Sequence, residues 1–145
     1  MTEPSDITKK PRADGQISGL AGEFFVAAEL LKREIQTSVT FGNAKAIDLF
    51  AHNPRTGTTF TVQVKTLRSD NYFLVDPKKI LRAHVYVFVL LNKPDQPVRY
   101  FVVPGGILLD ERARFGKGFQ VGNMPGILPK DLKDFEGNWK LFESQ

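Results

Sequence analysis

The sequence contains no cysteine, which excludes disulfides, thiolate metal sites and cysteine nucleophiles. No apolar run approaches the roughly 20 residues needed to span a bilayer, and the polar N-terminus lacks the apolar stretch of a signal peptide. The two histidines lack the spacing of a metal site, and neither a P-loop nor a Gly-x-Ser-x-Gly elbow is present. We therefore expect a cytoplasmic protein that has no membrane partner.

The composition is that of an ordinary soluble globular protein, with 41% hydrophobic and 25% charged residues. A chain of 145 residues is large enough to bury one hydrophobic core. We predict a flexible N-terminal arm over residues 1–15, which carries mixed charge and two prolines, and a single domain over residues 16–145. The net charge of +4 permits nucleic-acid binding without establishing it, and the basic residues are dispersed.

The N-terminal half of the domain predicts a helix followed by three strands. Ser18 suits the N-cap position, and apolar residues recur from there at helical spacing until the predicted end near Glu34: Leu20, Phe24, Ala27, Ala28 and Leu31. Segments rich in β-forming residues then predict strands over Thr37–Phe41, Ala46–His52 and Thr58–Leu67.

The second and third of these strands form a predicted hairpin. If Asn53 pairs with Thr58, the loop between them is Pro-Arg-Thr-Gly, a common hairpin connection. In that register Asp48 faces Gln63, and Lys65 is diagonal to Asp48. Opposed side chains have Cβ atoms about 5 Å apart, and diagonal neighbours are still within reach. The apolar residues of both strands then alternate onto the opposite face.

The C-terminal half predicts shorter elements. Asp76-Pro77 is a typical helix start, with Asp as N-cap and Pro at the first helical position. His84–Leu91 is almost continuously apolar and predicts a strand buried on both faces. The remaining expectations are a strand at Asn71–Val75, a helix from Pro77 through Arg82, a hairpin strand at Val98–Val103, short helices near Leu109–Phe115 and Pro129–Phe135, and a loop at Gly116–Gly126.

Glu23, Asp48, Gln63 and Lys65 are the candidate site residues. Mg²⁺ prefers oxygen ligands and typically takes one or two protein carboxylates together with phosphate oxygens. Glu23 and Asp48 would supply those carboxylates, the Gln63 amide a further oxygen, and Lys65 a positive charge for a developing transition state. These side chains on one helix and two paired strands therefore predict a Mg²⁺ or Mn²⁺ site beside a phosphodiester.

Each of the four residues also has a structural explanation. Glu23 lies in the first turns of its helix, where the helix dipole favours a carboxylate. Asp48 could be satisfied by a salt bridge to Lys65, whose stem can lie along apolar surface. Gln63 could be a solvated strand residue. The combination favours the functional interpretation more than any member does alone.

These residues, in this order, resemble the PD-(D/E)xK nuclease superfamily, which includes type II restriction enzymes and archaeal-type Holliday junction resolvases. The resemblance lies in Glu23 on a helix, then Ala46–Asp48, then Val62–Lys65, and Gly19–Glu23 is similar to the first helix of the resolvase-like branch. It implies a restriction-endonuclease-like αβββαβ core, an α/β fold whose mixed central sheet is flanked by helices. It also implies that Asp48 is the principal metal ligand, Lys65 the catalytic lysine and Glu23 an auxiliary ligand.

Gln63 departs from the superfamily pattern, in which most members carry Glu or Asp. A neutral amide removes one negative charge and weakens the attraction for a divalent cation. Active branches with Gln-x-Lys exist, including an intron-encoded homing endonuclease, so the departure is compatible with catalysis.

The leading hypothesis is a metal-dependent endonuclease that hydrolyses phosphodiester bonds in DNA, with branched or otherwise structured DNA among the candidate substrates and RNA left open. The alternative is a catalytically inactive nuclease-fold module that binds nucleic acid or a protein partner. A chain of this size has little surface left for reading a sequence. A homodimer, DNA shape or a partner protein would then supply the specificity.

Overall fold

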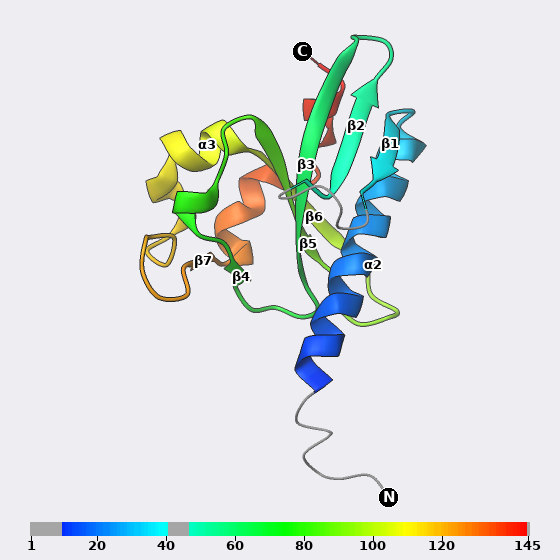
Figure 1. The fold of residues 1–145 in the computed structure, drawn as a ribbon. Helices are drawn as coiled ribbons and strands as arrows, with labels where there is room; N and C mark the ends of the chain where they lie inside the picture. The colour runs from blue at the N-terminus through cyan, green and yellow to red at the C-terminus, as the bar shows by residue number, and fades with distance from the viewer. Residues whose placement is uncertain (1–9, 41–46, 145) are drawn as a thin grey trace, which may run out of the picture.

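A five-stranded mixed sheet organises the molecule, and the computed structural model describes residues 10–40 and 47–144 (Figure 1). Its strands lie in the order β1-β2-β3-β5-β6, with β3 and β5 parallel and all other neighbours antiparallel. The bounds are α2 (Lys10–Lys32), β1 (Gln36–Val39), β2 (Leu49–Asn53), β3 (Thr58–Leu67), β5 (His84–Leu90) and β6 (Arg99–Pro104). This confirms the predicted α/β class with a mixed central sheet.

Shorter elements complete the fold. A two-stranded sheet joins β4 (Phe73–Leu74) to β7 (Gly126–Ile127). The remaining segments are α3 (Gly105–Asp110) and the 3₁₀ helices η1 (Pro77–Lys79), η2 (Arg112–Phe115), η3 (Pro129–Phe135) and η4 (Trp139–Phe142). Across the described ranges, no helix is both long and apolar enough to cross a membrane. The cytoplasmic location stays a prediction.

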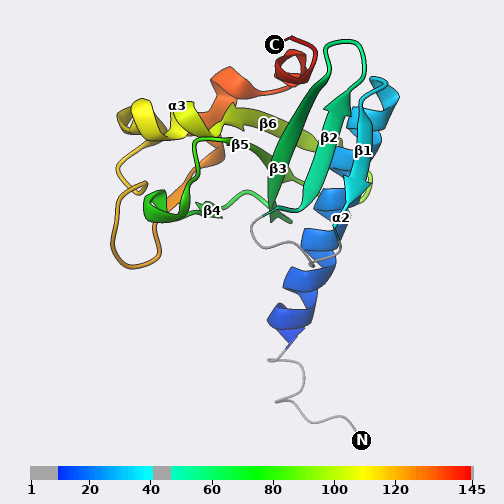
Figure 2. The ribbon, with the colours of Figure 1, turned by 45° about the horizontal axis from the view of Figure 1, so that its top comes forward.

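Two hydrophobic cores lie on opposite faces of the sheet, and β5 belongs to both. Val85, Val87 and Val89 point into the core that contains Val26 and Leu30 of α2. Tyr86, Phe88 and Leu90 point into the second core, which α3 and η3 cover with Leu108 and Leu132. All seven residues of β5 are buried, as the continuous apolar run predicts. Figure 1 and Figure 2 show α2 along one side of the sheet and α3 on the other.

The first helix begins eight residues earlier than predicted, at Lys10 instead of Ser18. Ser18 is buried and its hydroxyl accepts a hydrogen bond from Arg68 Nε at 3.0 Å, so it makes a tertiary contact within the helix. Pro11 stands in the first turn, where its missing N–H is not needed. Residues 10–15, which belong to the predicted arm, are thus part of α2, and residues 1–9 lie outside the described part of the chain.

The predicted helix from Pro77 through Arg82 is only the single 3₁₀ turn η1, which ends at Lys79. Asp76 is its N-cap as predicted, with Oδ1 accepting from Lys78 N at 3.0 Å. Ile80 leaves the turn in an extended conformation and is buried in the core with α3. Because the Ile80 side chain is buried in this core, the chain leaves the helical conformation after Lys79.

Two further helices differ in detail from their predictions. The helix expected near Leu109–Phe115 is divided into α3 and η2 at Glu111, whose φ and ψ are −119° and 41°. Pro129–Phe135 is helical as predicted, but with 3₁₀ geometry. Phe41, where the first predicted strand ends, and Ala46, where the second begins, lie outside the described residues.

Candidate active site

The β2–β3 hairpin has the predicted register over all of β2, from Leu49 opposite Val62 to Asn53 opposite Thr58. Asp48 departs from it. Its N–H donates to the Val62 carbonyl at 2.9 Å, so Asp48 and Leu49 both face Val62, which is the arrangement of a β-bulge. The predicted pairing of Asp48 with Gln63 was therefore wrong.

The bulge places the Asp48 carboxylate against the backbone of β3. Its Oδ2 accepts a hydrogen bond from Val64 N at 2.8 Å. Among the described strands, none pairs with β3 on this side beyond Val62, so the carboxylate takes the place of a backbone acceptor. The Asp48 carbonyl in turn accepts from Thr40 N at 3.0 Å. Asp48 is thus fixed from both neighbouring segments at the open end of the hairpin.

Glu23 reaches the same place from α2 because the helix packs very closely against β3. A Cβ atom added to Gly22 would lie 2.0 Å from Thr66 Oγ1, so only glycine permits this approach. The carboxyl group of the following residue, Glu23, comes within hydrogen-bonding reach of Asp48. Burial, together with the negative charge of Asp48 and this contact, raises the pKa of Glu23 to about 7.

Lys65 also lies close enough to Asp48 for the two charges to interact. Burial lowers the pKa of its ammonium group, the Asp48 charge opposes that shift, and the nearby Lys79 lowers the pKa further. The structure therefore brings three of the four predicted residues, Glu23, Asp48 and Lys65, into one electrostatically coupled group.

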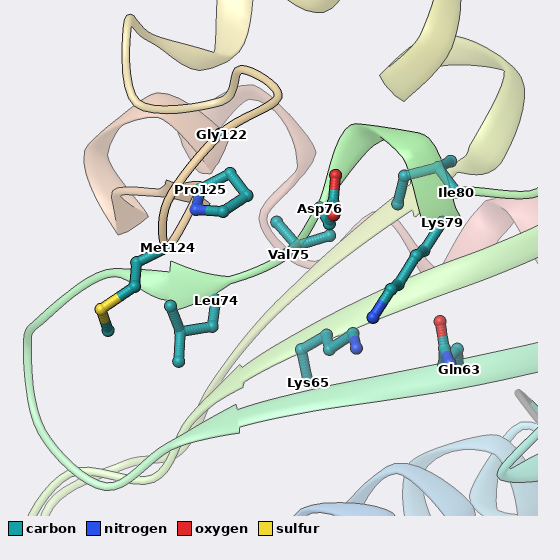
Figure 3. Close-up of a pocket in the computed structure, with 10 residues that line it drawn as sticks. All are labelled: Gln63, Lys65, Leu74, Val75, Asp76, Lys79, Ile80, Gly122, Met124 and Pro125. Carbon is teal, nitrogen blue, oxygen red and sulfur yellow. The ribbon is translucent and has the colours of Figure 1, made fainter.

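Gln63 shares a pocket wall with Lys65. The pocket has a volume of about 480 Å³, and its lining includes both side chains (Figure 3). Within the described residues, no hydrogen bond joins the Gln63 amide to Glu23 or Asp48. The role of Gln63 as a metal ligand stays a prediction.

No protein-family model matches the sequence, and no curated protein matches it either. Among solved structures, the bacterial homing endonuclease I-Ssp6803I matches with a TM-score of 0.53 and 16% sequence identity. The alignment covers 88% of this chain and 93% of that chain. The two proteins share a fold. At this identity the likeness establishes a nuclease-like α/β architecture, and the function has to be argued from the site.

The donor set of the site suits a hard divalent cation. Two carboxylates that share a proton repel each other once both are ionised, and a cation between them relieves that repulsion. Among the described side chains, no group of three or more His, Asp or Glu gathers in a way that could hold a metal. A cation held by Glu23 and Asp48 would therefore need water, phosphate or amide oxygens to complete its shell, which is how Mg²⁺ is usually bound.

Sequence reasoning missed Lys79, which lines the same pocket as Gln63 and Lys65. Lys78 and Lys79 are consecutive, and nothing in their sequence separates them. The difference comes from η1, in which Lys79 projects toward β3 (Figure 3). The adjacent lysines Lys78 and Lys79 were the available signal in the sequence. The direction of the Lys79 side chain, however, depends on the 3₁₀ turn.

Proposed function

We propose that this protein is a metal-dependent endonuclease of the PD-(D/E)xK type that acts on DNA. The observation that carries the proposal is the convergence of the Glu23 and Asp48 carboxylates with the Lys65 ammonium group at the open end of a β-hairpin. The shared fold with a homing endonuclease supports it. DNA as substrate and Mg²⁺ or Mn²⁺ as cofactor are parts of the proposal.

Each residue has a distinct task in this mechanism. Glu23 and Asp48 would hold the cation, and the Val64 N–H keeps Asp48 in position. When bound by these two carboxylates, Mg²⁺ would lower the pKa of a water nucleophile and polarise the phosphate. Lys65 lies close enough to Asp48 for their charges to interact. The Lys65 ammonium group can therefore stabilise negative charge that develops on the phosphate, or orient the attacking water.

The test is Mg²⁺- or Mn²⁺-dependent cleavage of linear, supercoiled and four-way DNA by the wild type and by Asp48→Ala and Asp48→Asn. Asp48→Asn removes the negative charge but keeps an oxygen acceptor for the Val64 N–H, whereas Asp48→Ala removes both. Comparing the two variants therefore separates the effect of the charge from the effect of the bulge geometry. Loss of a cation that supplies several kcal/mol predicts a fall in activity of about 10³-fold in both variants. Equal activity in wild type and variants would remove the assignment.

A catalytically inactive module that binds nucleic acid or protein is the second candidate. The neutral Gln63, which makes no hydrogen bond to either carboxylate among the described residues, favours it. Such a protein would bind DNA or a protein partner in calorimetry and show no metal-dependent cleavage in the same preparations.

Dimerisation is a further part of the proposal, because a single small domain leaves little surface for sequence readout. Light scattering at micromolar concentration should give the mass of a dimer. A mass of one chain, 16.3 kDa, would contradict it.

A further inference from the structure

The pocket beside the candidate active site is lined by two lysines from different elements. Lys65 comes from β3 and Lys79 from η1, and both line the space of about 480 Å³ together with Gln63. Figure 3 shows the two ammonium groups turned toward each other, with the Gln63 amide beside them. Their charges are close enough for Lys79 to lower the pKa of Lys65.

Neither lysine forms an ion pair within the described part of the chain. Every ion pair among the described residues is formed by an arginine. Asp76 is the acidic residue of the lining, and its Oδ1 is occupied by the Lys78 N–H. Two like charges that face one space repel each other, and an anion between them adds two attractive interactions that outweigh this repulsion.

The rest of the lining narrows the class of anion. Leu74, Ile80 and Pro125 are apolar residues of the same lining. A free inorganic anion would gain nothing from these side chains, whereas a nucleotide unit offers a phosphate to the ammonium groups and a sugar to the apolar residues.

We propose that Lys79 is a second phosphate-binding lysine of this site, which holds the same DNA backbone phosphate as Lys65. The inference rests on the proposed function for the identity of the ligand. Lys65 interacts with the Asp48 charge and lines the pocket together with Lys79, so a phosphate held near Asp48 by Lys65 would also be within reach of Lys79. Lys79 thereby positions the phosphodiester for the attack that the carboxylate pair supports.

The experiment is DNA binding by fluorescence anisotropy in Ca²⁺, over a range of salt concentrations, for the wild type, Lys79→Ala, Lys79→Arg and Lys78→Ala. Lys78 is the matched control, because it is the exposed neighbour of Lys79 and does not line the pocket. Loss of one phosphate contact should lower the slope of log K against log salt by about 0.9 and weaken binding about eightfold at 0.1 M salt. Lys79→Arg should restore most of the affinity, and Lys78→Ala should match the wild type.

Single-turnover cleavage in Mg²⁺ provides the second readout. Because Lys79 is expected to hold the phosphate that is cleaved, Lys79→Ala should lower the cleavage rate at saturating enzyme as well as the affinity. The thermal unfolding midpoint should be unchanged in all variants, since Lys78 and Lys79 are both exposed. If Lys79→Ala and Lys78→Ala behave alike while the wild type binds and cuts DNA, this inference fails alone. If the wild type neither binds nor cuts DNA, the proposed function fails with it.

Discussion

Close packing at Gly22 gives the sharpest test of how this site is assembled. An alanine Cβ at this position would lie 2.0 Å from Thr66 Oγ1 and 3.0 Å from Thr66 Cβ. Thr66 is β-branched and is paired with Val89 of β5, so its side chain cannot turn aside freely. Gly22→Ala must therefore move α2 away from β3, and Glu23 moves with it.

Gly19 provides the matched control in the same helix, since a Cβ added there meets nothing within 4 Å. Both substitutions gain about 1 kcal/mol from the higher helix propensity of alanine. Gly22→Ala also incurs an overpacking cost of about 1–3 kcal/mol. Subtracting the two unfolding free energies removes the shared gain and leaves that steric cost.

Urea unfolding of both variants measures the difference directly. With an m-value of about 1–3 kcal/mol/M, the two midpoints should differ by roughly 1 M, with Gly19→Ala the more stable. The double variant Gly22→Ala/Thr66→Ala should recover part of the loss, because the Thr66 hydroxyl is removed and that hydroxyl has no hydrogen-bond partner among the described residues. Equal stabilisation by Gly22→Ala and Gly19→Ala would refute the argument that glycine is needed for the helix to approach β3.

Two further predictions concern the acidic part of the site. In metal-free protein, the native pKa of Glu23 of about 7 exceeds its ordinary value of 4.5, so the native state holds more protons than the unfolded state between these values. The unfolding free energy should thus fall as pH rises through this window, and Glu23→Gln should remove that fall. If unfolding free energy plotted against pH in EDTA is the same for the wild type and Glu23→Gln, the prediction is contradicted. Gln63→Glu should tighten Mn²⁺ binding in calorimetry by about tenfold, because a third negative charge near the cation is worth at least about 1 kcal/mol. Gln36→Glu, at an exposed position of β1, is its control, and equal dissociation constants in the two variants would place Gln63 outside the metal shell.

Much of the sheet could be predicted because its signals are local. The bounds of β3 and the hairpin register follow from the turn chemistry and the alternation of apolar residues. The burial of β5 on both faces follows from its unbroken apolar run. Such patterns depend only on neighbouring residues and on the period of a strand.

The details that build the site depend on contacts between distant segments. The Asp48 side chain competes with the backbone for the Val64 N–H, and this competition creates a bulge that no alternation pattern reveals. Likewise, Ser18 is drawn into a tertiary hydrogen bond with Arg68, so the helix does not begin there. The direction of Lys79 is set by the packing of Ile80 against the second core.

The placement of β3 between two separate cores has a consequence for a chain that is only partly folded. Glu23 is carried by a helix on one face of the sheet, and Lys79 by a turn that packs on the other. A folding intermediate in which one face has condensed would thus hold either the carboxylate pair or the lysine pair, but not both. The complete charge arrangement therefore arises only when both faces of the sheet have folded.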